Sequence, residues 1–287
     1  MPDIRVVGIM AKPGIPHASA IVTELVAWLH ARGVEARLDP TASNYIGRSD
    51  GVEREKVPEG TQLIIVLGGD GTLLAAARAV AGRVIPIFPV NLGGLGFLTA
   101  ITLDQLYPQL ERAFSGEQRV VPRKMLHGEL VRDGKSLRSF QALNDIVIAK
   151  TQIARMIDLE MHVDEQYVST FKADGMILAT PTGSTAYSLS AGGPIVYPLV
   201  SAICITPVCP HMLTNRPVLV PDNMVIQVIV QTEDGQAYLT VDGQVGEPLR
   251  RNDRVVCRSS EHSVHLIRPP KMFFFDVLRQ KLKWGER

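Results

Sequence analysis

Apolar runs and helix-forming segments alternate along the first 121 residues of the chain. Short apolar runs predict strands at residues 4–10, 34–38, 63–67 and 84–90, and apolar positions at helical spacing predict helices at 18–32, closed by Gly33, and at 103–114. Strands joined by crossovers of this length lie parallel in one sheet, and ligands bind at the carboxyl ends of such strands. The pattern therefore predicts an N-terminal Rossmann-like α/β domain with a parallel sheet.

The pattern changes after residue 121. Short apolar or alternating runs predict strands at 163–168, 175–179, 217–220, 225–230, 238–241 and 255–257, and Asp-Gly pairs beginning at Asp133, Asp174, Asp234 and Asp242 predict hairpin-like turns. One helix is predicted at 184–191, and a C-terminal helix at 272–284 is expected to return to the first domain. We therefore expect an α/β plus all-β chain, with a first domain at 1–121 plus the tail 269–287 and a C-terminal β-sandwich-like domain at 122–268.

The composition of the 287 residues is that of an ordinary globular protein, with 46% hydrophobic and 21% charged residues. The net charge is +1 and Lys and Arg form no long run, which argues against nucleic acid or a membrane surface as a partner. No apolar segment reaches the roughly 18 residues of a membrane span, and the first residues lack a secretory pattern, so we expect a cytoplasmic location. The three cysteines, Cys204, Cys209 and Cys257, lack metal-site spacing and are interpreted as buried thiols.

The most informative turn follows the predicted strand at 63–67. Its sequence is Gly68-Gly69-Asp70-Gly71-Thr72, and an Ala- and Leu-rich helix-forming segment follows it. Glycines let a bulky group approach the backbone, and the amides at a helix start carry a partial positive charge that favours a phosphate. Gly68, Gly69, Gly71 and Thr72 are therefore candidate phosphate-binding residues, with the Asp70 carboxylate beside the phosphate.

Asp70 also has a simpler interpretation, as the N-cap of the following helix, and the turn alone does not decide between the two. The turn is neither a Walker A loop nor a Gly-x-Gly-x-x-Gly loop, and it contains no lysine. A phosphate-binding turn with a carboxylate inside it suits a kinase that delivers a γ-phosphoryl group to a hydroxyl next to a base.

A second polar segment, residues 180–194, has the sequence TPTGSTAYSLSAGGP and seven hydroxyl side chains between Thr180 and Ser190. Hydroxyls and the amides at a helix start can hold ribose and phosphate oxygens, and the ring of Tyr187 can stack on a flat base. The alternative, a Ser/Thr-rich capped helix with Tyr187 in the core, stays open on this segment alone.

The order and spacing of these motifs resemble the bacterial NAD kinase family over nearly the whole chain. The motifs that carry the resemblance are residues 68–72, the turn Asn91-Leu92-Gly93-Gly94-Leu95-Gly96-Phe97, the pair Asn144-Asp145, the pair Asp174-Gly175, and residues 180–194. The turn at 68–72 also resembles that of the diacylglycerol and sphingosine kinases and approximates that of phosphofructokinase. The longer segment beginning at Thr180 makes the match specific.

The resemblance implies ATP-dependent phosphorylation of the 2′-hydroxyl of the adenosine ribose of NAD, which gives NADP, with Asp70 as the proton acceptor. It also implies a divalent metal ion, usually Mg²⁺, and a homodimer or homotetramer. We expect the ATP phosphates to hold most of this ion without a dedicated protein cage, because Mg²⁺ keeps several waters and needs only one or two protein carboxylates. The residues that it places against NAD are Asp70, Gly71, Asn144, Asp145, Arg155, Lys172, Asp174, Thr185, Ala186, Tyr187, Ser188, Leu189, Ser190 and Gln244.

Two other classes of function stay open at this point. A lipid or sugar kinase could use the same turn, but it would leave Asn144-Asp145 and the hydroxyl-rich segment without a role. A dinucleotide-binding regulator without chemistry would not need Asp70. An assay for NADP formed from ATP and NAD separates the three.

Overall fold

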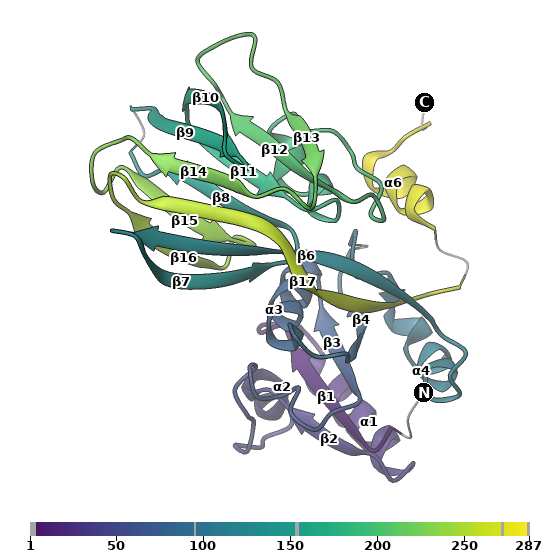
Figure 1. Cartoon of the computed structure of the whole chain (residues 1–287). Coiled ribbons are helices and arrows are strands. Elements are labelled where there is room, and N and C mark those ends of the chain that lie inside the picture. The colour runs from purple at the N-terminus through teal and green to yellow at the C-terminus, as the bar shows by residue number, and fades with distance from the viewer. Residues whose placement is uncertain (1–3, 95, 153–154, 271–272, 286–287) are drawn as a thin grey trace. The chain divides into compact units, whose positions relative to one another are not determined.

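The computed structural model describes residues 4–94, 96–152, 155–270 and 273–285 (Figure 1). The chain divides into two compact units, Met1–Pro122 with Val264–Arg287, and Arg123–Ser263. Leu95 of the second glycine-rich motif and residues 271–272, where the predicted C-terminal helix begins, lie outside the described residues.

The first unit is built on a parallel sheet with the strand order β4–β3–β1–β2. Its strands are β1 (Val6–Ala11), β2 (Glu35–Leu38), β3 (Leu63–Gly68), β4 (Pro86–Asn91) and the short β5 (Ile101–Thr102), which pairs with β4. Its helices are α1 (Ala18–His30), α2 (Pro40–Tyr45), α3 (Asp70–Val80), the 3₁₀ turn η1 (Leu103–Gln105), α4 (Leu106–Phe114) and α6 (Phe274–Leu282). The predicted Rossmann-like α/β domain is confirmed.

Helices cover both faces of this sheet. Ile9 and Ile65 pack in one cluster with Leu25 of α1 and Leu110 of α4. The intervening strand residues point the other way, and α3 packs on β1, β3 and β4. Strands that are buried on both faces need apolar residues at nearly every position, which is why these runs are recognisable in the sequence.

The end of the chain returns to this sheet. The last residues of the long strand β17 (Arg254–Arg268) pair in parallel with β4, with His265 opposite Pro86 and Leu266 opposite Ile87. Helix α6 belongs to the same unit. The predicted return of the tail to the first domain is therefore confirmed.

The second unit is a sandwich of two sheets. One sheet contains, in order, β10 (Gln166–Ala173), β9 (Ile157–Val163), β14 (Ile226–Val230) and β17, with β6 (Arg119–Arg132) and β7 (Lys135–Ala142) beyond it. The other has the order β13 (Val218–Pro221), β12 (Ala202–Val208), β11 (Gly175–Ala179), β8 (Asp145–Lys150), β15 (Ala237–Val241) and β16 (Val245–Leu249). Leu159 and Val228 of the first sheet share one core with Leu178 and Leu239 of the second. The β-sandwich-like prediction is confirmed.

The outer face of the six-stranded sheet is covered by residues 180–194. Val147 and Cys204 on this face pack with Ala191 of the segment. The Ser188 hydroxyl lies 2.9 Å from the Thr206 hydroxyl and 3.6 Å from the Cys204 sulfur, so the segment is tied to the sheet by polar as well as apolar contacts.

Two of the four predicted hairpin turns are wrong. Asp133-Gly134 and Asp242-Gly243 join neighbouring antiparallel strands with positive φ at each residue. Asp174-Gly175 and Asp234-Gly235 lead instead from one sheet of the sandwich to the other. An Asp-Gly pair favours a turn, but it does not determine which strand the chain pairs with next.

Two further element predictions are wrong. The strand predicted at 163–168 is a hairpin, because β9 ends at Val163, Asp164 turns with a φ of 53°, and β10 begins at Gln166. The helix predicted at 184–191 divides into the 3₁₀ turn η2 (Gly183–Thr185) and α5 (Tyr187–Ser190), since Ala186 between them has a φ of −100° and a ψ of −127°.

Cys209 is exposed, which corrects its interpretation as a buried thiol; Cys204 and Cys257 are buried. Cys209 directly follows β12, where its φ of 45° ends the extended backbone. Helix α2 was not predicted, although Pro40 at its first position and Asp39 as its N-cap are signals for it.

Candidate active site

The glycine-rich turn joins β3 to α3 in the first unit. The helix begins at Asp70, and Gly69 is its N-cap. Gly68 and Thr72 are buried, whereas Gly69 is partly exposed and Gly71 is exposed. A Cβ added to Gly68 would lie 2.5 Å from the Thr72 hydroxyl oxygen, so that position has room only for glycine. Gly69 and Gly71 are the predicted phosphate-binding glycines that a ligand can reach.

The Asp70 carboxylate accepts hydrogen bonds from the end of the second glycine-rich turn. Its Oδ2 accepts from the Phe97 N–H at 2.9 Å. Its Oδ1 accepts from the Leu98 N–H at 3.2 Å, the Thr99 N–H at 3.0 Å and the Thr99 hydroxyl at 2.9 Å. Within the part of the chain that the structure describes, the N-cap of α3 has no side-chain hydrogen bond. This geometry contradicts the interpretation of Asp70 as a helix N-cap.

A lysine lies beside the turn, although the turn itself contains none. Lys12 directly follows β1, and its Cβ lies 3.0 Å from the place that a Cβ on Gly68 would take. The Tyr45 hydroxyl fastens this backbone, because it donates to the Lys12 carbonyl at 2.8 Å and accepts from the Ile15 N–H at 3.0 Å. Sequence reasoning missed Lys12; the signal is its place after a strand that neighbours β3 in a parallel sheet.

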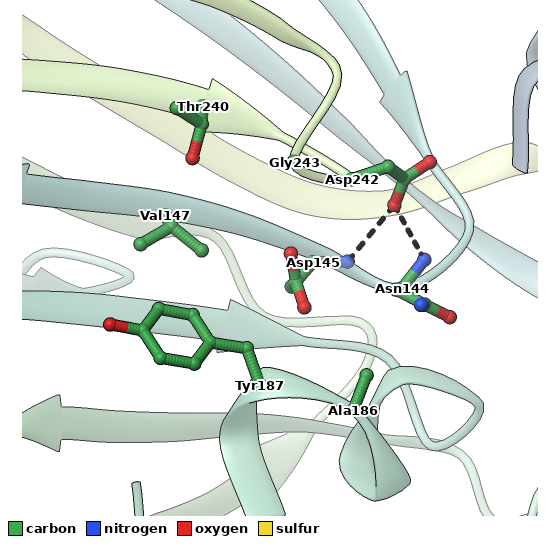
Figure 2. Close-up of a pocket in the computed structure, with 8 residues that line it drawn as sticks. All are labelled: Asn144, Asp145, Val147, Ala186, Tyr187, Thr240, Asp242 and Gly243. Carbon is green, nitrogen blue, oxygen red and sulfur yellow. Dashed lines mark hydrogen bonds between the residues drawn. The ribbon is translucent and has the colours of Figure 1, made fainter. Parts of the chain in front are cut away.

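The second unit holds a pocket of about 340 Å³ on the outer face of its six-stranded sheet (Figure 2). Asp145 and Val147 of β8 lie beside Thr240 of the neighbouring β15, and Ala186 and Tyr187 come from the segment 180–194. Asn144, Asp242 and Gly243 complete the lining. The volume is within the range of small-molecule sites in proteins.

Hydrogen bonds hold the backbone of Asn144 from two sides. The Thr180 N–H donates to its carbonyl oxygen at 2.8 Å. The Asp242 carboxylate accepts from the N–H groups of Asn144 at 2.8 Å, Asp145 at 3.2 Å and Leu143 at 3.1 Å, two of which are dashed in Figure 2. The Asn144 backbone is therefore fixed before any ligand binds.

Burial raises the pKa of Asp145 to about 7, and the neighbouring Asp242 carboxylate adds to the rise. Only 5% of Asp145 is exposed. Three backbone N–H groups donate to the Asp242 carboxylate. Near neutral pH, Asp145 can therefore act as a hydrogen-bond donor as well as an acceptor.

Tyr187 lies with its ring along the pocket (Figure 2), and 46% of its surface is exposed. This contradicts the alternative in which Tyr187 is a core residue. With Asn144, Asp145 and Ala186, it makes four predicted NAD contacts that the structure brings together in one pocket.

Eight other predicted NAD contacts do not line this pocket. Asp174 forms an ion pair with Lys150, with 2.6 Å between Oδ1 and Nζ. Ser188 is fully buried beneath the segment, and Arg155 and Lys172 are exposed on a loop and on β10. The remaining four are Thr185, Leu189, Ser190 and Gln244.

Four lining residues were missed by sequence reasoning. Val147 and Thr240 have the composition of ordinary strand residues, and Asp242-Gly243 was interpreted only as a turn. The available signal for Thr240 is the alternation along β15, which places it on the same face of the sheet as Tyr238. The first four residues of β8 are all buried, so β8 gives no such signal for Val147.

Two family models match the chain. The model of the ATP-NAD kinase N-terminal domain matches residues 7–118, and that of the ATP-NAD kinase C-terminal domain matches residues 143–269. The chain belongs to the ATP-NAD kinase family. It is 61% identical over 287 residues to the NAD kinase of Solibacter usitatus (strain Ellin6076), covering 100% of each chain. It is 48% identical over 285 residues to the NAD kinase of Koribacter versatilis (strain Ellin345), covering 99% of this chain and 100% of the relative.

Two solved structures share the fold. Yeast NADH kinase in complex with NADH superposes with a TM-score of 0.92 at 27% identity, covering 100% of this chain and 90% of the other. An NAD kinase from Archaeoglobus fulgidus in complex with ATP has a TM-score of 0.76 at 26% identity, covering 97% and 98%. The kinase prediction is confirmed: the chain is an enzyme of ATP-dependent NAD phosphorylation. Within the described residues, no helix has the length and apolarity needed to span a membrane.

The close approach of Gly183 to Asn144 gives a first prediction. A Cβ on Gly183 would lie 2.0 Å from the Asn144 carbonyl oxygen, which the backbone cannot easily avoid. Gly183→Ala should lower the free energy of unfolding by about 1–3 kcal/mol and raise the KM for NAD. Urea unfolding and steady-state kinetics measure both. Wild-type stability together with a wild-type KM for NAD in Gly183→Ala would contradict the prediction.

The raised pKa of Asp145, about 7 in the fold against an ordinary value of 3.8, gives a pH-dependent stability. Because the folded pKa is the higher one, the neutral form stabilises the fold below about pH 4, and this contribution is lost as the pH rises through about 7. Wild-type stability should therefore fall between pH 5 and 8 by about 2–3 kcal/mol more than that of Asp145→Asn. Urea unfolding at both pH values tests this, and parallel pH profiles of the two proteins would refute it.

Proposed function

We propose that Asp70 accepts the proton of the 2′-hydroxyl of the adenosine ribose of NAD while the γ-phosphoryl group passes from ATP to that oxygen. The observation that carries this proposal is the Asp70 carboxylate, held by four donors beside a turn whose Gly69 and Gly71 can be reached by a ligand. Phosphoryl transfer has a loose transition state, so the hydroxyl becomes acidic late, and a carboxylate base contributes on the order of 10²–10⁴-fold.

In this proposal the glycine-rich turn of the first unit binds the ATP phosphates. The amides at the start of α3 provide partial positive charge, and Lys12 beside Gly68 provides the cation that the turn lacks. Gly68 and Thr72 shape the turn from beneath, because both are buried.

A divalent ion, Mg²⁺ by the family resemblance, fits this turn as an ion that the ATP phosphates and water hold. Within the described residues, His, Cys, Asp and Glu form no group of three that could hold a metal ion. Mg²⁺ keeps several waters and needs one or two carboxylates at most. The bound ion would neutralise phosphate charge, and Asp70, whose oxygens already accept four hydrogen bonds, would keep its role as base.

In this proposal the pocket of the second unit, which we call the adenosine pocket, binds the adenosine portion of NAD. Asn144 and Asp145 offer polar groups on a fixed backbone, and the exposed ring of Tyr187 offers a flat face to the purine. Asp242 acts through the backbone of Asn144 and Asp145. Contacts from the other predicted residues rest on the family resemblance alone: Arg155, Lys172, Asp174, Thr185, Ser188, Leu189, Ser190 and Gln244.

The proposal also includes a cytoplasmic location and assembly as a homodimer or homotetramer. Both stay predictions that rest on the chain's composition and on the family resemblance.

Asp70→Asn tests the base assignment. Asparagine keeps the shape of the side chain but loses the negative charge, so kcat should fall by at least about 10²-fold while NAD still binds. Its amide group would face one of the four donors, so a modest loss of stability, about 1–3 kcal/mol, is expected as well. Steady-state kinetics of NADP formation, an NAD titration and a thermal melt on the same variant measure these effects. Near-wild-type kcat with unchanged NAD affinity would end the assignment.

Tyr187 gives a test of the adenosine pocket. Tyr187→Ala should raise the KM for NAD by about tenfold, whereas Tyr187→Phe, which keeps the ring face, should stay close to wild type. Equal losses in both variants would point to the phenolic hydroxyl instead of stacking. Loss of folding in both, seen by thermal melting, would make the ring a packing residue.

A further inference from the structure

The two oxygens of the Asp70 carboxylate have unequal surroundings. From the residues that the structure describes, Oδ1 accepts three hydrogen bonds, given by the Leu98 N–H, the Thr99 N–H and the Thr99 hydroxyl, whereas Oδ2 accepts one, from the Phe97 N–H. A carboxylate offers about two lone pairs on each oxygen. Oδ1 is therefore saturated, and Oδ2 has a lone pair left for a substrate proton.

The space beside Oδ1 is also closed. A Cβ added to Gly96 would lie 2.2 Å from Oδ1 and 2.3 Å from the Thr99 hydroxyl oxygen. The Gly96 backbone therefore packs directly against Oδ1 and occupies this side of the carboxylate, where it blocks the approach of a ribose hydroxyl. This steric observation is independent of the hydrogen-bond count, and it also leaves Oδ2 as the reachable oxygen.

The hydrogen bonds of the Asn91 side chain set the direction of the Thr99 hydroxyl proton. The Asn91 Oδ1 accepts from the Gly93 N–H at 2.7 Å, which fixes the orientation of the amide. Its Nδ2 donates to the Gly94 carbonyl at 2.8 Å and to the Thr99 hydroxyl oxygen at 2.9 Å. Because that oxygen already accepts from Asn91, the proton of Thr99 is directed to Oδ1 of Asp70, 2.9 Å away.

The fold supports this chain of hydrogen bonds from Asn91 through the Thr99 hydroxyl to Asp70, which we call the relay. Asn91 is the last residue of β4 and lies opposite Gly68, the last residue of the neighbouring β3. Thr99 is 0% and Asn91 5% exposed, so water cannot readily replace either donor. Together with the backbone N–H donors of residues 97–99, Asn91 and the Thr99 hydroxyl therefore set the rotation of the Asp70 carboxylate.

We infer that Asn91 and Thr99 are positioning residues of the phosphoryl transfer, which saturate Oδ1 of Asp70 and leave Oδ2 as the oxygen that accepts the 2′-hydroxyl proton. The inference rests on the proposed role of Asp70 as the base. In the transfer, the O–H bond of the ribose breaks, its proton goes to Oδ2, and the oxygen forms a bond to the γ-phosphorus as the bond from that phosphorus to the departing ADP oxygen breaks. Neither Asn91 nor Thr99 gives up a proton.

Thr99→Val tests the relay, because it removes the hydroxyl at nearly constant volume and leaves the backbone N–H donors in place. We expect kcat to fall about tenfold or more with the KM for NAD unchanged, since a carboxylate that has lost one of its four donors presents the wrong oxygen part of the time. Thr99→Ser keeps a hydroxyl and should restore kcat to within about twofold of wild type. Wild-type kcat in Thr99→Val, a change confined to KM, or failure of serine to rescue would each overturn the inference.

Thr61→Val is the matched control for stability. Thr61 is a buried threonine, 6% exposed, in the same unit, and its hydroxyl donates to the Pro58 carbonyl at 3.1 Å. Losing this hydroxyl should lower the melting temperature but leave kcat unchanged. An equal loss of kcat in Thr61→Val and Thr99→Val would mean that the effect of Thr99 is only one of stability.

Asn91→Asp keeps the test decisive if Thr99→Val does not fold. The new carboxylate cannot donate to Thr99 and would accept its proton instead, so kcat should fall although Thr99 is present; wild-type kcat would overturn the inference. Asp70→Asn in the same assay separates the two proposals. If Asp70→Asn is inactive and Thr99→Val is fully active, the relay alone is wrong. If Asp70→Asn is active, the base assignment fails first.

Discussion

The hydrogen bonds between the Asp70 carboxylate and residues 97–99 join the two glycine-rich turns of the first unit. A carboxylate at the end of a buried strand needs donors, because leaving it without partners would cost several kcal/mol. The donors come from a backbone segment 27 to 29 residues further along the chain. The position of Asp70, the close approach of Gly96 and the fold of the loop after β4 therefore depend on one another.

In the second unit, too, one carboxylate accepts hydrogen bonds from several backbone N–H groups, but here it also affects the pKa of a neighbouring carboxyl. The Asp242 carboxylate accepts hydrogen bonds from the three backbone N–H groups of residues 143–145, and these bonds fix the backbone of Asn144 and Asp145. The charge of Asp242 then lies close to the buried Asp145 carboxyl and helps to raise its pKa. In both units one carboxylate orders the backbone beside the groups that we propose as substrate contacts.

Much of the fold could be predicted from the sequence, because strands such as β3, buried on both faces, consist of continuous apolar runs that glycine-rich turns interrupt. Asp70 and Tyr187 could be recognised as candidate site residues from the turn and the hydroxyl-rich segment, and their roles stay predictions. Val147 and Thr240 could not, since their place in the pocket depends on the pairing of β8 with β15, two strands that lie far apart in the sequence. The same limit explains Asp174-Gly175, whose turn was predicted and whose change of sheet was not. The relay from Asn91 to Asp70 depends on the pairing of β3 with β4 in the same way.

The most direct test of the account is a crystal structure of this chain with NAD and a non-hydrolysable ATP analogue bound together. The account predicts that the 2′-oxygen of the adenosine ribose lies within about 3.2 Å of Oδ2 of Asp70, with Oδ1 still bonded to Thr99. A 2′-oxygen that contacts Oδ1 would contradict the orientation of the carboxylate, and one beyond hydrogen-bond reach of either oxygen would contradict the role of Asp70 as the base.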